Sequence, residues 1–222
     1  VQISALPILM RQKINDKFQI FNGIDGEFTS KILEVTKKFL ITEIVEKTSD
    51  LTKAPNITLA FAPVKNVRID FIATKATELG VGAFQPIITQ HSVVDKINQQ
   101  RFRSNVKEAC EQCERNDFPH INDILKLNKL LNVADQEDKI FILCDESGEG
   151  TKASIALPAI NTKGKEIVIL IGPEGGFAKE EFEKMRNMNN VYSISLGPRI
   201  LRTDTAIISA LTLVQEFMGD FN

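Results

Sequence analysis

Two short, unbroken apolar runs constrain the fold of this chain more than any other feature of its sequence. Residues 140–144 (IFILC) and 167–171 (IVILI) contain no charged, hydroxyl or amide side chain. Such runs are typical of strands buried on both faces, which occur in parallel sheets covered by helices. Apolar stripes with helical spacing alternate with strand-like runs, at residues 69–79, 102–113, 178–188 and 203–218. The alternation predicts an α/β fold with a mostly parallel sheet.

The first third of the chain has a different pattern. Four runs are rich in β-branched and aromatic residues, at residues 18–21, 28–35, 39–45 and 57–61. The pairs Asn22-Gly23 and Asp25-Gly26 are typical of the turns between strands. These features predict a small β-barrel or β-rich domain of about 60 residues. With a boundary near residues 63–68, the chain divides into residues 1–66 and residues 67–222.

Composition excludes several classes of protein. The 27 basic and 29 acidic residues give a net charge of −2, which lacks the long-range attraction expected of a general nucleic-acid coat protein. No apolar stretch is long enough to cross a bilayer, so we expect no membrane partner. The first ten residues lack the features of a signal peptide, and without an initiator Met the question of residues upstream of Val1 stays open. Three cysteines cannot form a disulfide framework, so we expect a reducing, cytoplasmic location.

A glycine-rich loop follows the second apolar run. Gly172, Gly175 and Gly176 place bare backbone at the carboxyl edge of the predicted sheet, where open α/β sheets bind ligands. A phosphate site is disfavoured, because the loop carries Glu174 and has no Gly-Lys-Ser/Thr sequence. The sequence therefore favours a cationic or neutral ligand, and a plain strand-to-helix turn is the alternative.

A second loop repeats this design before the last predicted helix. A strand at residues 191–196 leads into a Gly197-Pro198 turn and then into residues 199–202, with an arginine at each end. Thr203 is predicted to cap the helix, and Asp204 complements the helix dipole. Arg202 is different, because a cation at a positive helix N-terminus is locally unfavourable. We therefore expect Arg202 to have an anionic partner or a function.

Two other motifs are weaker. Residues 148–153 match the Gly-x-Gly-x-x-Gly/Ala dinucleotide pattern, which would support an NAD-dependent oxidoreductase, but the surrounding acidic residues favour a surface turn. Cys110 and Cys113 lie in a predicted helix among glutamates, and the chain offers no convincing further ligands for a metal. Core packing is the interpretation we prefer for these cysteines, and we expect no metal site.

Several segments, taken in order, resemble a known family. They are residues 71–81 (FIATKATELGV), 109–116 (ACEQCERN) with Pro119, 171–177 (IGPEGGF) and 196–206 (LGPRILRTDTA). They are similar to the bacterial 16S rRNA uracil-N3 methyltransferases of the RsmE type, in the SPOUT class. The resemblance is dense over residues 65–218. More loosely, residues 10–13 and 18–23 are similar to the family's PUA-like barrel.

The resemblance implies a trefoil-knotted, mostly parallel SPOUT sheet domain preceded by a small PUA-like β-barrel that binds RNA. It implies S-adenosylmethionine as the cofactor, a homodimer with the active site at the subunit interface, and methylation of N3 of one uridine in the 16S rRNA of the 30S subunit. The implied cofactor-binding residues lie in three loops: Cys144, Asp145, Glu146, Gly172, Pro173, Glu174, Gly175, Gly176, Leu196, Gly197, Pro198, Ile200 and Leu201.

The reaction assigns further roles. Removing the imide proton of uracil N3 leaves negative charge on O2 and O4, and we expect Arg202 to stabilise that charge. Glu174, with Asp204 or a water as alternatives, is the candidate that accepts the proton. The residues expected to contact RNA phosphates are Arg11, Lys13 and Arg115, for which a solvated surface charge is the alternative.

The chain also departs from the family pattern. His91 stands where an arginine is common, and Glu114 replaces a usual glycine. A pure RNA-binding module is a rival interpretation, but it leaves the glycine loops without a purpose. Residues 1–66 carry a net charge of +2 and the remainder −4. We therefore expect a local basic surface, assembled across a dimer, and weak binding to random RNA at physiological salt.

Overall fold

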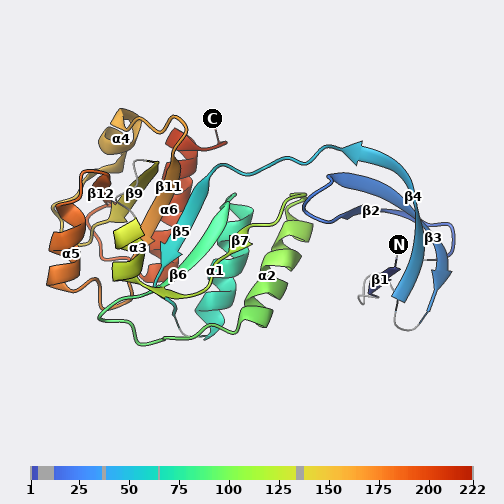
Figure 1. Ribbon diagram of the computed structural model, residues 1–222, viewed down its shortest axis with the longest axis horizontal. Helices are drawn as coiled ribbons and strands as arrows, with labels where there is room; N and C mark the ends of the chain where they lie inside the picture. The colour runs from blue at the N-terminus through green and yellow to red at the C-terminus, as the bar shows by residue number, and fades with distance from the viewer. Residues whose placement is uncertain (1, 5–12, 37–38, 65, 134–137, 222) are drawn as a thin grey trace. The chain divides into compact units, whose positions relative to one another are not determined.

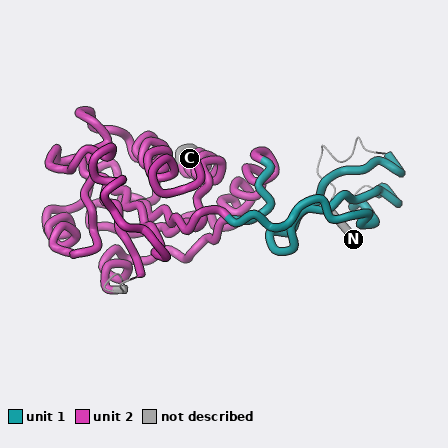
Figure 2. The backbone as a smooth tube through the Cα atoms, turned by 90° about the horizontal axis from the view of Figure 1, so that it is seen from above, with its two compact units in different colours: residues 1–53, 114–118 teal, residues 54–113, 119–222 magenta. Residues whose placement is uncertain are grey.

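The chain forms two compact units. The structure is a computed structural model that describes residues 2–4, 13–36, 39–64, 66–133 and 138–221. Unit 1 comprises residues 1–53 and 114–118, and unit 2 comprises residues 54–113 and 119–222 (Figure 2). The predicted division at residues 66/67 differs from this one, and the reason lies in the strand described below as β5.

Unit 1 is a four-stranded antiparallel sheet. Its strands are β1 (Gln2–Ser4), β2 (Lys17–Phe21), β3 (Glu27–Val35) and β4 (Phe39–Ser49), in the order β1-β4-β3-β2 (Figure 1). The turn between β2 and β3 contains Gly23 and Gly26, both with positive φ, as the Asn-Gly and Asp-Gly pairs predicted. Ile32 and Leu40 are fully buried in this unit.

A short segment that comes later in the sequence, residues 114–118, completes unit 1. Asn116 is 7% exposed, and its side chain makes three hydrogen bonds: its Nδ2 donates to Ser49 Oγ (3.1 Å) and to the Asp50 carbonyl (2.9 Å), and its Oδ1 accepts from Thr52 N (3.0 Å). Phe118 lies 5.2 Å from Phe21 between ring centroids. Glu114, at the start of the segment, has φ +59°, which explains why a glycine is usual at this position.

The replacement Asn116→Ala is expected to destabilise unit 1 selectively. It removes the hydrogen bonds that the buried Asn116 side chain makes with Thr52 N, the Asp50 carbonyl and Ser49 Oγ. Because those three residues are exposed and their groups can bond to water instead, we expect a cost of about 1 kcal/mol. Hydrogen exchange followed by mass spectrometry should show faster exchange in β3 and β4 and unchanged exchange in residues 139–144 and 166–171 of unit 2. Gln112→Ala, an exposed change in the helix Gln99–Gln112, is the matched control. Equal protection of β3 and β4 in the Asn116 variant would contradict the role of this segment.

Unit 2 contains an eight-stranded sheet whose pairings are all parallel among the described residues. Its strands are β5 (Ile57–Phe61), β6 (Ala83–Ile88), β7 (His120–Ile121), β8 (Leu125–Lys126), β9 (Lys139–Cys144), β10 (Thr151–Lys152), β11 (Glu166–Ile171) and β12 (Val191–Ser195). The order is β10-β12-β9-β11-β5-β6-β7, with β8 beside β6. The predicted α/β class with a mostly parallel sheet is confirmed.

The strand β5 corrects the sequence analysis. Residues 57–61 do form a strand, but its assignment to the β-rich domain is wrong, because β5 pairs with β11 and β6 in the parallel sheet. All five of its residues are buried. The run ITLAF therefore has the same unbroken burial as β9 and β11, and the alternation expected of a sheet with one wet face is absent.

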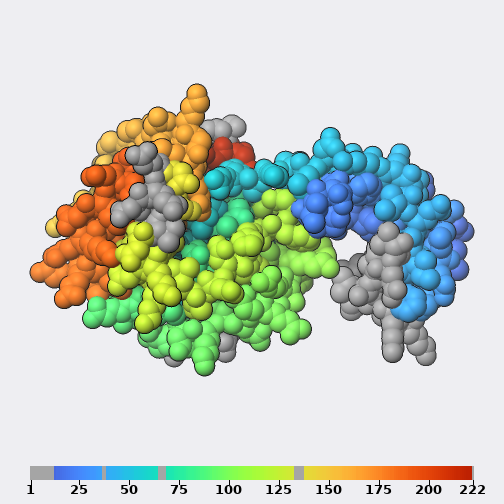
Figure 3. All heavy atoms as spheres, viewed as in Figure 1, coloured from blue at the N-terminus to red at the C-terminus, as the bar shows by residue number. Residues whose placement is uncertain are grey.

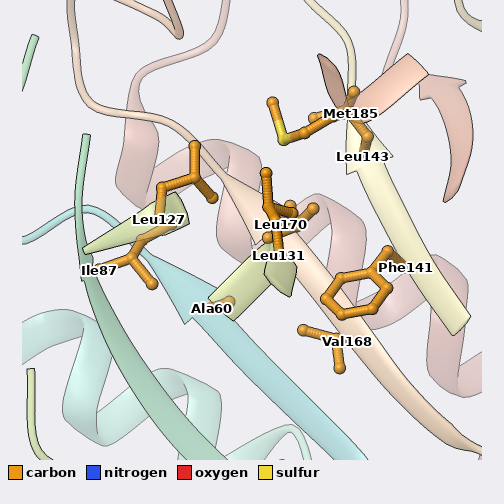
Figure 4. Packing of buried hydrophobic residues seen from close by; sticks show 9 residues of the cluster. All are labelled: Ala60, Ile87, Leu127, Leu131, Phe141, Leu143, Val168, Leu170 and Met185. Carbon is orange, nitrogen blue, oxygen red and sulfur yellow. The ribbon is translucent and has the colours of Figure 1, made fainter. Parts of the chain in front are cut away.

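Helices cover both faces of this sheet (Figure 1). They are α1 (Asn66–Glu78), α2 (Gln99–Gln112), α3 (Leu127–Val133), α4 (Ala153–Ala156), α5 (Lys179–Arg186) and α6 (Thr203–Met218), with a 3-10 turn η2 (Leu157–Ala159). α1 packs against α2 and α6, and α6 packs against β11. On the other face, α3 and α5 contribute Leu127, Leu131 and Met185 to a core with Phe141 and Leu170 (Figure 4).

The predicted helices and strands of unit 2 agree with these elements, and Gly80 has φ +75° just after α1, as a C′ residue does. Cys110 is buried, but Cys113 is exposed, so the expected core packing holds for only one of the pair. Within the described residues, none of the helices is both long enough and apolar enough to cross a bilayer.

Candidate functional site

Three loops at the carboxyl edge of the parallel sheet enclose a pocket of about 300 Å³. They follow β9, β11 and β12, which are neighbours in the sheet. Open α/β sheets bind ligands at this edge. The residues that line the pocket are Cys144, Asp145, Glu146, Ser147, Gly148, Ile171, Gly172, Pro173, Gly176, Phe177, Leu196, Gly197, Pro198, Arg199, Ile200, Leu201, Thr203 and Ala206.

The pocket brings together nearly all of the predicted cofactor-binding residues. Of the set named in the sequence analysis, only Glu174 and Gly175 do not line it, and both lie in the loop between two lining residues, Pro173 and Gly176. The prediction missed Ile171, just before the glycine loop, and Arg199, within the loop after β12. It also missed Ser147, Gly148, Phe177, Thr203 and Ala206. These residues directly follow predicted segments, so extending each loop by a few residues would have included most of them.

The loop after β11 contains a tight turn. The Gly176 N–H donates to the Pro173 carbonyl (2.9 Å), and Gly176 has φ +68°. A Cβ at Gly176 would lie 1.8 Å from Glu146 Oε1. Gly176 is therefore a position where glycine is needed twice, once for its backbone conformation and once because the Glu146 carboxylate lies against it.

The loop after β12 is joined to the glycine loop by one hydrogen bond. The Thr203 hydroxyl donates to the Gly172 carbonyl at 3.3 Å, and Thr203 is buried. The prediction that Thr203 caps α6 is wrong, because the N-cap residue is Arg202, whose side chain makes no capping hydrogen bond. The hydroxyl is used between the two loops, where it fixes the start of α6 against the glycine loop.

The loop after β9 is acidic and strongly connected. The Asp145 side chain is fully buried, and its carboxylate accepts hydrogen bonds from Ser147 N (2.7 Å) and from Arg186 Nη2 (2.5 Å). Arg186 also contacts Glu149 and lies over the Phe182 ring, 4.6 Å from its centroid. The hydrogen bonds with Asp145 and then with Glu149 raise the pKa of Arg186, so the arginine remains a cation at any ordinary pH.

Cys144 lines the pocket without being a nucleophile. Its burial and then the charge of Asp145 raise the pKa of the thiol far above its ordinary value. The thiolate is the reactive form of cysteine. Cys144 therefore contributes an uncharged, apolar surface to the pocket wall.

The segment that follows β6 contacts the glycine loop. His91 Nδ1 lies 3.1 Å from the Gly175 carbonyl. Next to it, the Gln90 N–H donates to Glu181 Oε1 (2.9 Å), and the second oxygen of Glu181 accepts from Ala178 N (3.0 Å). These contacts connect the segment after β6 to the glycine loop and to the start of α5.

Comparison with protein families agrees with this geometry. Residues 52–215 match the model of the RNA methyltransferase domain, and residues 9–45 match the RNA methyltransferase PUA domain. Ribosomal RNA small subunit methyltransferase E of Rickettsia conorii is 32% identical over 207 residues, which cover 93% of this chain and 83% of that protein. The chain belongs to the ribosomal RNA small subunit methyltransferase E family. The member of this family from Bacillus subtilis is 30% identical, with 93% of this chain and 84% of that protein covered.

Solved structures of this family have the same fold. The Neisseria gonorrhoeae ribosomal RNA small subunit methyltransferase E, bound to S-adenosyl methionine, has a TM-score of 0.83 at 26% identity, covering 100% of this chain and 94% of that one. A putative methyltransferase from Legionella pneumophila, in complex with the same cofactor, has a TM-score of 0.83 at 28% identity, with the same coverage.

Of the three residues predicted to contact RNA, one falls outside the described residues, one is exposed and one is largely buried in an ion pair. Arg11 falls outside the described residues. Lys13 is exposed in unit 1. Arg115 forms a forked pair with Asp117, with Nε to Oδ1 at 2.7 Å and Nη2 to Oδ2 at 3.0 Å, and only 12% of its side chain is exposed. A guanidinium used in this way has fewer N–H groups to offer a phosphate.

The two predicted catalytic residues border the pocket from opposite loops. Glu174 is exposed and lies between the lining residues Pro173 and Gly176. Arg202 is also exposed and lies between Leu201 and Thr203, which both line the pocket. Through the Thr203–Gly172 hydrogen bond, the two loops that carry these side chains are in direct contact.

Proposed function

We propose that this protein uses S-adenosylmethionine to methylate N3 of a uridine in the 16S rRNA of the small ribosomal subunit. The pocket carries this proposal. Three loops at one sheet edge combine glycine backbone, apolar side chains and the acidic side chain of Glu146. Arg202 and Glu174 border these loops. The names of the relatives and the cofactor in two solved neighbours support the same reading.

The pocket residues fit this cofactor. Gly197 leaves its backbone accessible to a flat adenine ring, because a Cβ there would meet nothing within 4 Å, and Phe177 and Leu201 supply apolar surface. Glu146 suits the hydroxyls of a ribose or a positive centre and repels a phosphate. When bound, S-adenosylmethionine supplies a methyl group on a positively charged sulfur, which keeps the electron pair of the broken bond as the methyl passes to the base nitrogen.

The chain's own groups handle the proton and the charge. The N3 proton passes to a carboxylate, for which we propose Glu174, while the nitrogen retains the electron pair that forms the new bond. The negative charge that spreads to uracil O2 and O4 lies next to Arg202, whose guanidinium donates hydrogen bonds to it. Asp204, with its Oδ1 bonded to Thr205 N (2.9 Å), is less suited, because it is already engaged at the helix start.

We also propose that the protein acts as a homodimer on the 30S subunit in the cytoplasm. Ile200, at the mouth of the pocket, is 84% exposed, and a second subunit that covers it would shield this apolar side chain from water. Lys13 in unit 1 is proposed to contact phosphates and position the RNA. Light scattering coupled to size exclusion should give twice the mass of one chain, and a monomer at micromolar concentration would contradict the dimer.

Reverse transcription of 16S rRNA tests the reaction. N3 methylation blocks Watson–Crick pairing, so 30S subunits incubated with protein and S-adenosylmethionine should give a new stop at a single uridine. Omitting the cofactor is the control, and a parallel incubation with naked rRNA shows whether the assembled subunit is needed. Absence of a cofactor-dependent stop on both substrates would contradict the proposed function.

A further inference from the structure

Arg186 is the most heavily engaged charged residue near the pocket, yet it does not line it. It lies at the end of α5, on the surface of unit 2, where Figure 3 shows this helix in orange. The helix begins two residues after the glycine loop, and Arg186 reaches from it to the loop after β9. One side chain of α5 thus holds the loop after β9 at three of its residues.

The contacts of Arg186 flank the pocket residue Glu146 on both sides. Its Nη2 donates to Asp145 Oδ2 (2.5 Å) and to Ser147 Oγ (3.0 Å), and its Nη1 contacts Glu149. The residue between the first two partners is Glu146. Neither Asp145 nor Ser147 is free to rotate away, because the Asp145 carboxylate also accepts the Ser147 N–H at 2.7 Å.

The backbone at this point is fixed from the sheet side as well. The Asp145 N–H donates to the Ile194 carbonyl of β12 (2.9 Å). With both neighbours held, the backbone of Glu146 is fixed, and its carboxylate lies against Gly176. The buried Asp145 side chain has no exposed surface, so its negative charge requires Arg186 as a counter-ion.

We propose that Arg186 is a positioning residue for cofactor binding, which holds residues 145–149 so that the Glu146 carboxylate faces the glycine loop. This inference rests on the proposed function. It assigns different tasks to two neighbouring acidic residues: Asp145 is bound internally by Ser147 and Arg186, and Glu146 is the carboxylate presented to the ligand. The expected ligand group is the pair of ribose hydroxyls, which a carboxylate recognises in other α/β nucleotide sites.

A double-mutant cycle measured by calorimetry tests this role. We expect Arg186→Ala and Glu146→Gln each to weaken S-adenosylmethionine binding about tenfold. Because Arg186 acts through Glu146, the double variant should also lose only about tenfold, whereas independent residues would lose about 100-fold. Lys179→Ala, an exposed change on the same helix that removes an ion pair with Glu183, should bind like the wild type and add no coupling.

Hydrogen exchange without cofactor gives a second readout. In Arg186→Ala the amides of residues 145–150 should exchange faster, while those of β5 and β6 stay protected. Arg186→Lys keeps the charge but lacks the fork, and it serves if the alanine variant unfolds; it should fold normally and bind several-fold more weakly. Wild-type affinity in the variant that folds, or a 100-fold loss in the double variant, would overturn the positioning role alone. A wild-type protein that does not bind S-adenosylmethionine would overturn the proposed function and this role together.

Discussion

Replacing Arg202 with alanine should reduce the rate of methyl transfer by about 100- to 1000-fold, with cofactor affinity unchanged. Arg202 is exposed at the start of α6 and does not line the pocket, whereas both of its neighbours in sequence do. This placement is the reason we propose that Arg202 interacts with the target base and not with the cofactor. Single-turnover transfer of a labelled methyl group to 30S subunits measures the rate, and calorimetry measures the affinity.

Two further variants sharpen this experiment. Arg202→Lys keeps a positive charge but has no forked pair of donors, so it should recover only part of the rate. Arg103→Ala, which removes an exposed arginine of α2, controls for the loss of a surface cation. If Arg202→Ala transferred methyl groups at the wild-type rate, charge stabilisation would have to come from another group.

The second large effect is expected from Gly176→Ala, which should weaken S-adenosylmethionine binding by about 10- to 100-fold. The added methyl would lie 1.8 Å from Glu146 Oε1, and Glu146 is a flexible side chain that can move. The protein should therefore still fold, with the carboxylate displaced from its place in the pocket. Alanine at the positive φ of this position also adds a strain of about 1–2 kcal/mol to the folded state of the variant.

Gly164→Ala separates strain from displacement. Gly164 also has positive φ (+73°), but a Cβ there would meet nothing within 4 Å, and the residue does not line the pocket. Thermal denaturation should show similar losses of stability in both variants, and only the Gly176 variant should lose affinity. Equal affinity in the two variants would contradict the arrangement of Glu146 against the glycine loop.

The positions of two of the three pocket loops were predictable from sequence, because they follow strands whose burial is visible in their composition. Residues 140–144 and 167–171 are continuous apolar runs, and the chain must leave a parallel sheet where such a run ends. Gly172 marks the second of these exits, and the Gly197-Pro198 turn marks the end of the third strand, β12, which is only partly buried. The same reasoning succeeded for α6, whose predicted bounds agree with the structure.

The contacts that connect the loops were not predictable. Arg186 and Asp145 are 41 residues apart, and nothing in either local sequence indicates that they pair. The Thr203 hydroxyl was assigned to the helix N-terminus by a local rule, and a tertiary partner, the Gly172 carbonyl, uses it instead. Local rules predict contacts between residues that are close in sequence. These side chains contact residues that are distant in sequence, so local rules cannot predict their partners.

The assignment of β5 failed for a related reason. Sequence proximity to the β-rich segment suggested one sheet, but its uninterrupted burial indicated the other. The helix α3 was missed altogether, because its seven residues are too few to display a helical period. In both cases the decisive information is which surface the element covers, and this depends on partners that are distant in sequence.

The segment at residues 114–118 has a consequence for how the protein is made. A ribosome that has finished residue 53 must add about 60 more residues before Asn116 exists, which takes about 3–12 s at ordinary rates of synthesis. During that interval Ser49, Asp50 and Thr52 lack their hydrogen bonds to the Asn116 side chain. Unit 1 is therefore completed late, after α1 and α2 have been synthesised.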